Sequence, residues 1–201
     1  MAVHWNNHLM CAVDVETTGL DADKHEIWQI AIVPLKSDLT IRKDIPPFYM
    51  DLQPQKPPET FEPQAIRMNK EKVLKAIERG IDPYKAADYF DDWFQKLNLP
   101  MYKKILPLAH NWPFENRFLH AWLGSFNMDQ FFFGYRDTMV LANVINDIAD
   151  MRNEPWPFAK VSLGYMCSTL KIENLDPHDA LGDAVACAEV YRTLVRRYRL
   201  V

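Results

Sequence analysis

The sequence lacks the features that mark membrane proteins, secreted proteins and cysteine-based metal sites. No apolar run approaches the roughly 20 residues of a membrane span, and the N-terminus shows no signal-peptide pattern. Only three cysteines are present, and Cys11, Cys167 and Cys187 are too widely spaced for a metal-binding pattern or a disulfide framework. These absences predict a cytoplasmic protein with no membrane partner and with buried, free thiols.

The chain also lacks an excess of positive charge. Its 23 Lys and Arg residues against 27 Asp and Glu residues give a formal net charge of −4, which argues against a protein that wraps a nucleic-acid duplex. The same balance suits an enzyme whose carboxylates hold divalent cations. With 48% hydrophobic residues and no internal repeat or low-complexity tract, the 201 residues predict one domain over 1–201.

Hydrophobic periodicity predicts strands first and then an alternation of helices and strands. Short apolar stretches predict strands at about 8–15, 26–33, 48–52, 105–109 and 130–136. Apolar stripes predict helices from about 69, over 84–97, after Asn111, after Asp137, over 162–171 and over 179–199. Asn111 is the expected cap of its helix, and Pro113 suits the first turn. This order indicates a mixed sheet covered on both faces.

Two carboxylates, Asp14 and Glu16, stand at the end of the first predicted strand, in the segment "DVETTGL". Residues i and i+2 of a strand share one face, so these side chains project side by side. Two like charges at that separation repel each other unless solvent screens them or a cation compensates them. The pair is therefore either exposed at a strand end or holds a cation.

Further polar residues occur in two later segments. In "HNWPFENRFL", Glu115 lies in the first turn of a predicted helix, just past the carboxyl end of a strand, where open α/β sheets build their sites. In "HDALGDA", His178 and Asp183 would lie on different faces of one continuous helix. They converge only if His178 lies in the loop after Pro177 and Asp183 lies in the first turns of the helix.

Together, "DVETTGL", "AHNWPFENRFL" and "HDALGDA" resemble, in this order, the three motifs of the DEDDh 3′–5′ exonuclease family. That family includes bacterial proofreading exonuclease subunits, ribonuclease T and oligoribonuclease. Smaller similarities at "EIWQIAIV", "AIRMNKEKV", "YRDTMVLANVI" and "SLGYMCSTLKI" extend the resemblance over about 10–196. The resemblance implies an α/β, ribonuclease H-like fold with a mixed five-stranded sheet in the order 3-2-1-4-5, flanked by helices.

The resemblance also implies a site for two divalent metal ions, Mg²⁺ or Mn²⁺. Asp14 would bridge the two ions, Glu16 and Asp183 would complete one metal site, and Glu115 would support the other. His178 would be the general base, because an imidazole can accept a proton at neutral pH. The family usually has Asp where this chain has Glu115, and glutamate keeps the charge while adding one methylene.

The same resemblance assigns contacts with the 3′-terminal nucleotide. Thr17, Thr18, Gly19 and Leu20 would receive this nucleotide. Gly19 permits a close approach of the backbone, and Leu20 can wedge between the last two bases. Asn69 would flank the terminal sugar.

Several residues around the second motif keep two interpretations each. His110 and Asn111 either line the site or form structural hydrogen bonds. Trp112, at a position where the family usually has a small residue, stacks on a base as aromatic residues do in single-strand binding, or packs in the core. The same two alternatives hold for Phe114. Asp137 is expected to accept hydrogen bonds from the backbone at a helix start, not to bind metal.

The predicted function is a metal-dependent 3′–5′ exonuclease that releases nucleoside 5′-monophosphates from single-stranded DNA or RNA. The residues do not separate DNA from RNA, because the 2′-hydroxyl contact depends on geometry, so ribonuclease T-like trimming of RNA is one alternative. A second is a module with weakened catalysis that holds a 3′ end or a protein partner. The chain ends at Val201 directly after its last predicted helix, which suggests a stand-alone enzyme without a polymerase-docking tail.

Overall fold

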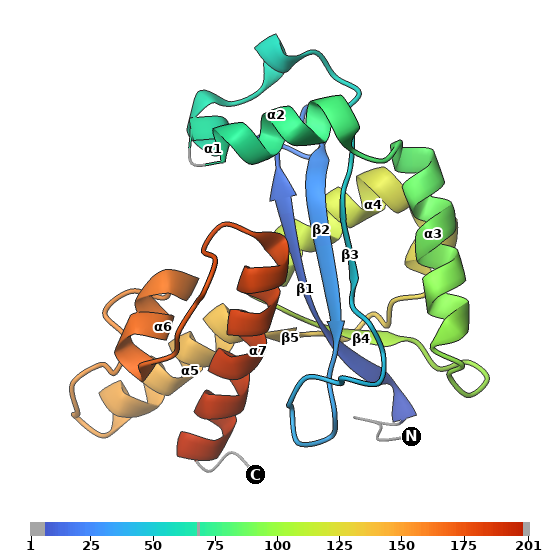
Figure 1. Ribbon diagram of the computed structural model, residues 1–201. Helices are drawn as coiled ribbons and strands as arrows, with labels where there is room; N and C mark the ends of the chain where they lie inside the picture. Colours follow the sequence, from blue (N-terminus) through green and yellow to red (C-terminus); the bar gives the residue numbers. More distant parts are fainter. Residues whose placement is uncertain (1–6, 68, 199–201) are drawn as a thin grey trace.

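The computed structural model describes residues 7–67 and 69–198 and contains a mixed sheet with helices on both faces (Figure 1). The strands are β1 (Leu9–Thr17), β2 (Ile27–Pro34), β3 (Phe48–Asp51), β4 (Ile105–Ala109) and β5 (Arg136–Asp137). In this 5-stranded sheet the order is β3-β2-β1-β4-β5, with β1, β2 and β3 antiparallel in turn and β1, β4 and β5 parallel. The predicted fold class and strand order are therefore confirmed.

Every predicted helix is present among the described residues. The helices are α1 (Pro63–Arg67), α2 (Lys70–Arg79), α3 (Pro83–Lys96), α4 (Trp112–Met128), α5 (Thr138–Met151), α6 (Leu163–Leu170) and α7 (Ala180–Arg197), with a short 3₁₀ helix at Pro58–Thr60. Position 199, the predicted end of the last helix, lies outside the described residues. In the part of the chain that the structure describes, no helix has both the length and the apolar character to cross a membrane.

The central strand β1 alternates its side chains between two cores. Its odd-numbered residues pack with α3 and α4 on one face, and its even-numbered residues pack against α7 on the other: Leu9, Cys11, Val13 and Val15 on the first face, Met10 and Ala12 on the second. Asp14 and Glu16 continue the even-numbered series, so both carboxylates lie on the α7 side of the sheet. The three cysteines are buried and free, as predicted.

The two cores differ in side-chain size. On the α3–α4 face the Phe90 ring packs 5.5 Å from Phe48 and 5.7 Å from Phe131, measured between ring centroids. On the other face α7 presents small residues, among them Ala180 and Ala184, to β1 and β2. Small side chains let a helix approach a sheet closely, which brings the start of α7 beside the carboxyl end of β1.

The predicted strand at 130–136 is wrong in extent. The segment first pairs with β4, where Phe132 N–H donates to the Ile105 carbonyl at 2.7 Å. The chain then leaves the sheet at Phe133, whose side chain is 86% exposed, and it rejoins the sheet only at Arg136. Phe132 packs on Phe133 instead of alternating with it across the sheet, with ring centroids 4.3 Å apart. The run of three phenylalanines therefore does not follow strand periodicity.

Candidate active site

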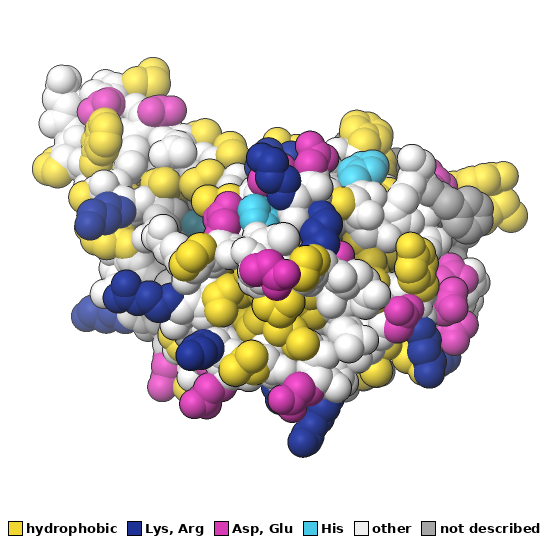
Figure 2. Space-filling model, turned by 90° about the horizontal axis from the view of Figure 1, so that it is seen from above, with side chains coloured by type: hydrophobic (Ala, Val, Ile, Leu, Met, Phe, Trp, Pro, Cys, Tyr) yellow, Lys and Arg dark blue, Asp and Glu magenta, His cyan; other side chains and the backbone are white. Residues whose placement is uncertain are grey.

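The carboxyl end of β1 gathers acidic side chains from three separate parts of the chain. β1 supplies Asp14 and Glu16, the first turn of α4 supplies Glu115, and the start of α7 supplies Asp183. Figure 2 looks onto this end of the molecule and shows acidic, histidine and basic (Lys or Arg) side chains close together near the middle of the face. No single sign of charge dominates this face.

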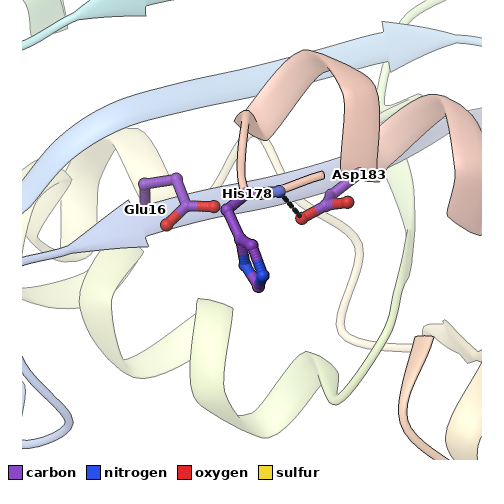
Figure 3. A group of neighbouring side chains, drawn as sticks. All are labelled: Glu16, His178 and Asp183. Atoms are coloured by element: carbon purple, nitrogen blue, oxygen red, sulfur yellow. Dashed lines mark hydrogen bonds between the residues drawn. The ribbon is translucent and has the colours of Figure 1, made fainter. Parts of the chain in front are cut away.

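Glu16, His178 and Asp183 form the most compact group of this site (Figure 3). One ligand atom from each of the three lies within 4.8 Å of the others. His178 lies in the loop before α7, where its backbone N–H donates to Asp183 Oδ2 at 3.1 Å. Its φ of 62° is a left-handed conformation that costs a non-glycine residue energy. The sequence predicted that His178 and Asp183 converge only if His178 lies in the loop and Asp183 lies in the first turn of the helix. Both positions are found.

The start of α7 is fixed by hydrogen bonds at its N-terminus. Asp179 caps the helix by accepting from Leu181 N–H at 3.1 Å and Gly182 N–H at 3.3 Å. Gln29 of β2 accepts the Ala180 N–H at 2.9 Å. A Cβ atom on Gly182 would lie 2.4 Å from the backbone oxygen of Asp176, so only glycine lets the preceding loop lie this close to the helix.

A lysine on α2 holds the loop that carries His178. Lys72 Nζ lies 3.2 Å from both carboxylate oxygens of Asp176 and 3.3 Å from Asp179 Oδ2. Tyr49 OH donates to the same oxygen of Asp179 at 2.9 Å. Burial opposes ionisation of Asp179, but the Tyr49 and Gly182 hydrogen bonds and the Lys72 charge together lower its pKa. We call Lys72, Asp176 and Asp179 the Lys72 latch.

Glu16 and Asp183 both accept hydrogen bonds from protein donors. Asn69 Nδ2 donates to Glu16 Oε2 at 3.3 Å, and Asn174 Nδ2 donates to Asp183 Oδ1 at 2.6 Å. Burial, followed by repulsion from Asp183, raises the pKa of Glu16 to about 7, although the positive charge of Lys72 acts in the opposite direction. We call Glu16 and Asp183 the outer pair.

We call Asp14 and Glu115 the inner pair, and in this pair one oxygen of Glu115 lacks compensation from the described residues. The Glu115 side chain is 3% exposed, and its Oε2 has no hydrogen-bond partner among the described residues. Burial raises the pKa of Glu115 well above its usual range, against a hydrogen bond from its own backbone N–H and with a smaller contribution from Asp137. Burial also raises the pKa of Asp14, followed by repulsion from Glu115, Glu16 and Asp183.

The donor set of this site fits divalent metal ions. Carboxylate oxygens are the ligands that Mg²⁺ and Mn²⁺ prefer, and four carboxylates converge here. The buried Oε2 of Glu115 lacks the partner that a buried charged oxygen requires, and a cation would supply it. The longer glutamate at this position therefore still reaches the group of carboxylates.

The turn after β1 presents its backbone and one apolar side chain. Thr17 Oγ1 donates to the Gly19 carbonyl at 2.7 Å, and Thr18 Oγ1 accepts the Glu26 N–H at 3.0 Å, so both hydroxyls are committed to the turn. A Cβ on Gly19 would lie 2.5 Å from the His25 ring, which leaves no room for another residue there. The Leu20 side chain is 67% exposed. Leu20 is therefore the side chain of this segment that is most available to a ligand.

Residues of the second motif serve mainly structural contacts. His110 Nδ1 lies 2.7 Å from Thr138 Oγ1, and burial lowers the pKa of His110. The Trp112 side chain is 5% exposed and packs beside Phe131 and Tyr135, so the core-packing alternative is the one found. Its ring turns into the core on the α3–α4 side, which is how the helix accommodates a large residue at this position.

The cap of α4 comes from a neighbouring element. Asp137 Oδ2 accepts the Trp112 N–H at 2.8 Å, whereas Asn111 was the predicted cap. Asn111 adopts a φ of 82° between β4 and α4, and its carbonyl accepts the Phe114 N–H at 2.8 Å. Asp137 Oδ1 also accepts the Met139 N–H at 2.8 Å at the start of α5. The predicted backbone role of Asp137 is confirmed, and the same carboxylate joins two helix starts.

Lys72, Asn174 and the capping role of Asp179 were not predicted from the sequence. The contacts of Lys72 with Asp176 and Asp179 join positions 104 and 107 residues apart, which no local pattern indicates. The Asp179 cap had a local signal, because an Asp directly before an apolar helical stripe is typical of a helix start.

The chain matches an exonuclease family model and is similar to solved nuclease structures. A family model described as Exonuclease (RNase_T) matches residues 11–191. E. coli exonuclease I in complex with a dT13 oligonucleotide is similar, with a TM-score of 0.69, 18% identity and coverage of 96% of this chain and 42% of that chain. The Mg²⁺- and Mn²⁺-bound form of S. pombe Pop2p gives a TM-score of 0.69, 13% identity and coverage of 94% and 84%.

A third similar structure is that of a 3′-exonuclease in the 3′-end specific recognition of a histone mRNA stem-loop. It gives a TM-score of 0.67, 16% identity and coverage of 98% of this chain and 65% of that chain. The chain thus spans less than two thirds of the length of this structure and of exonuclease I. A search of curated proteins found no match.

Proposed function

Because the chain belongs to the exonuclease family whose model matches residues 11–191, we propose that it is a metal-dependent 3′–5′ exonuclease. The inner pair gives this proposal its strongest support. Glu115 is buried with an unpartnered oxygen, and Asp14 is repelled by Glu115, Glu16 and Asp183, although packing alone gives no reason to keep four carboxylates together. A hydrolase that binds cations requires such a group.

The carboxylates divide between two cations. Asp14, which is repelled both by Glu115 and by the outer pair, would contact both ions, Glu16 and Asp183 would hold one, and Glu115 would support the other. When bound, such ions lower the pKa of a coordinated water and offset the charge that develops on a phosphodiester during hydrolysis. The structure of S. pombe Pop2p with Mg²⁺ and Mn²⁺ supports divalent ions of this kind.

His178 would accept the proton of the attacking water. Its side chain is exposed, and its backbone is fixed by the hydrogen bond to Asp183 and by the Lys72 latch on the same loop. A positioned imidazole is the commonest general base in enzymes. The outer pair and His178 therefore act as one unit, in which Asp183 contributes both to cation binding and to the position of His178.

The substrate we propose is the 3′ end of a single strand, with DNA as the first candidate and RNA as the second. The exonuclease I complex with dT13 supports DNA, and the histone mRNA exonuclease supports RNA. The net charge of −4 favours a single strand over a duplex, because duplex binding depends on many phosphate contacts. Thr17 to Leu20 and Asn69 would hold the terminal nucleotide, with Leu20 against its base.

Hydrolysis of end-labelled oligonucleotides tests this function. Single-stranded DNA and RNA of one sequence, labelled at the 5′ end, are incubated with Mg²⁺ or Mn²⁺. We expect a ladder that shortens from the 3′ end, stops with EDTA and disappears in Asp14→Ala, and release of nucleoside 5′-monophosphates. Tight binding of the 3′ end without hydrolysis under either metal would contradict the proposed exonuclease activity. It would favour the alternative of a module that only binds the 3′ end.

A further inference from the structure

A concave surface lies outside the carboxylate site. It is a groove of about 830 Å³ between α4 and the segment that leads into β5. Its volume falls within the range of about 300–1,000 Å³ that is typical of ligand clefts. The α4 residues along it run from Trp112 to His120, which spans roughly 12 Å at 1.5 Å per helical residue, and continue with Ser125 and Met128 beyond the kink at Gly124. The surface is therefore elongated, unlike a compact pocket for one small molecule.

Exposed aromatic rings line this groove. Tyr102 is 84% exposed, Phe133 is 86% exposed and Tyr135 is 41% exposed. The Phe133 ring packs on Phe132, with ring centroids 4.3 Å apart. The Tyr135 ring centroid lies 6.4 Å from that of the buried Trp112. These rings are thus supported on one side and open on the other. Such rings are the stacking platforms on which single-strand binding proteins place successive bases, independently of sequence.

The groove is also positively charged on a chain that is negative overall. Its charged lining residues are Lys103, Lys104 and Asp129, which give +1 with histidines neutral, against −4 for the chain. Lys104 Nζ pairs with Asp129 Oδ1 at 2.6 Å. Lys103 forms no ion pair with any residue that the structure describes. Lys103 is therefore the cation of this groove that is available to a phosphate.

One end of the groove lies at the first turns of α4, the helix that also carries Glu115. Pro113 and Asn116 line the groove, and both flank Glu115 in the first turns of α4. The other end reaches Lys103 and Lys104, which precede β4. A strand that leaves the site around the start of α4 therefore meets Tyr135, which packs beside Trp112, first along its path, and Tyr102 with the lysines at the far end.

From this juxtaposition we propose that the groove binds the single strand upstream of its 3′ end. Bases stack on Phe133, Tyr135 and Tyr102, and Lys103 contacts a phosphate. This inference rests on the proposed exonuclease function and adds a length preference to it. Substrates long enough to reach the groove bind more tightly than a dinucleotide, which occupies the carboxylate site alone.

A comparison of substrate lengths tests the groove. Hydrolysis of a 20-mer and of a dinucleotide is measured with wild type, Phe133→Ala and Tyr102→Ala. The control is Met151→Ala, because Met151 is 84% exposed and lies outside the groove. We expect KM for the 20-mer to rise about 5- to 100-fold in each aromatic variant, in line with the loss of one stacked base. The kcat for the 20-mer and all constants for the dinucleotide should stay unchanged.

Salt dependence separates the lysine contact from the stacking. In Lys103→Ala the slope of log KM against log salt for the 20-mer should fall by about 0.7, as expected for the loss of one phosphate contact on a single strand. Lys160→Ala, a change at an exposed lysine outside the groove, should leave the slope unchanged. Unchanged constants for the 20-mer in the three groove variants, or equal losses on the 20-mer and the dinucleotide, would overturn the proposal.

Binding measured without hydrolysis tests the groove separately from the exonuclease function. If wild type hydrolyses neither substrate, the exonuclease function fails, and the groove is then tested by fluorescence anisotropy of a labelled 20-mer in EDTA. Weaker binding in Phe133→Ala than in Met151→Ala supports the groove in that case. Equal binding by the two variants overturns it.

Discussion

The inner and outer carboxylate pairs differ in what compensates their charge. In the outer pair, Glu16 accepts from Asn69 and Asp183 accepts from both Asn174 and the His178 backbone. In the inner pair, the Glu115 Oε2 has no partner among the described residues. The protein therefore organises the outer pair by itself and leaves the inner pair dependent on a proton or a cation. This difference indicates that cation binding matters most at the inner pair.

Removal of the inner pair is expected to have the largest effect on hydrolysis. Asp14→Ala and Glu115→Ala should each lower hydrolysis by about 1000-fold or more, since metal ligation is worth several kcal/mol of transition-state stabilisation. Metal-free, both variants should melt at or above the wild-type temperature, because the substitution relieves repulsion. Steady-state rates and thermal melts measure both effects.

Two further variants serve as controls for the inner pair. Glu115→Asp should retain activity with a changed Mn²⁺ to Mg²⁺ rate ratio, because it keeps the carboxylate on a backbone adapted to a longer side chain. Asp88→Ala, at an exposed position of α3, should change neither rate nor melting temperature. Wild-type rates in Glu115→Ala would show that this carboxylate is only a first-turn residue that favours the helix N-terminus.

Removal of His178 tests the outer pair without removing a carboxylate. His178→Ala should lower kcat by about 10²- to 10⁴-fold, the usual contribution of a general base. Metal affinity, followed as the Mn²⁺ concentration that gives half-maximal thermal stabilisation, should change far less than in Glu115→Ala. A kcat within twofold of wild type would remove His178 from the mechanism.

A smaller effect is expected from the Lys72 latch. Lys72→Ala should lower kcat roughly 10- to 100-fold, as is usual for residues that position ligands from outside. Lys72→Arg should restore most of the rate, because arginine can still pair with Asp176 and Asp179. Lys70→Ala, an exposed lysine on the same helix, is the matched control. Equal rates for Lys72→Ala and Lys70→Ala would show that the latch does not position His178.

The smallest effect is on the stability of the metal-free protein as a function of pH. The pKa of Glu16 is raised to about 7, and those of Asp14 and Glu115 are raised well above their usual range. Between its unfolded pKa of about 4.3 and this folded value, Glu16 binds more protons in the folded state. The stabilisation is complete below the unfolded pKa and is lost as pH rises through about 7.

Thermal melts of the metal-free protein check this dependence. The melting temperature should rise by a few degrees from pH 8 to pH 5, since a change of 1 kcal/mol corresponds to about 2–4 °C for a chain of this size. The rise should be smaller in an Asp14→Asn, Glu115→Gln double variant, in which two of the titrating groups are gone. The same rise in both proteins would show that the inner pair does not carry the effect.

Sequence alone predicted the fold where local pattern and three-dimensional position agree. β1 and α7 are continuous periodic segments, so their faces and the side-by-side arrangement of Asp14 and Glu16 followed from strand and helix geometry. The separation of His178 from α7 followed from Pro177 and from the angle between helical positions. The motif order supplied the rest of the arrangement by resemblance.

The remaining features depend on contacts between distant segments. The direction of the Trp112 ring is set by Phe131 and Tyr135, and the Lys72 latch joins α2 to the loop before α7. No local pattern encodes either contact. The interruption of the predicted strand at 130–136 has the same origin, because Phe133 could be placed outside the sheet only from its tertiary surroundings.

Calorimetric titration of the metal-free protein with Mn²⁺ shows directly whether the inner pair depends on a cation, because it measures ion binding without substrate or turnover. Wild type should bind two ions, and Glu115→Gln, which keeps the size of the side chain but removes its charge, should lose one of them or bind it at least tenfold more weakly. Asp88→Ala should bind like wild type. If Glu115→Gln binds two ions with wild-type affinity, the inner pair does not depend on a cation and the account is wrong.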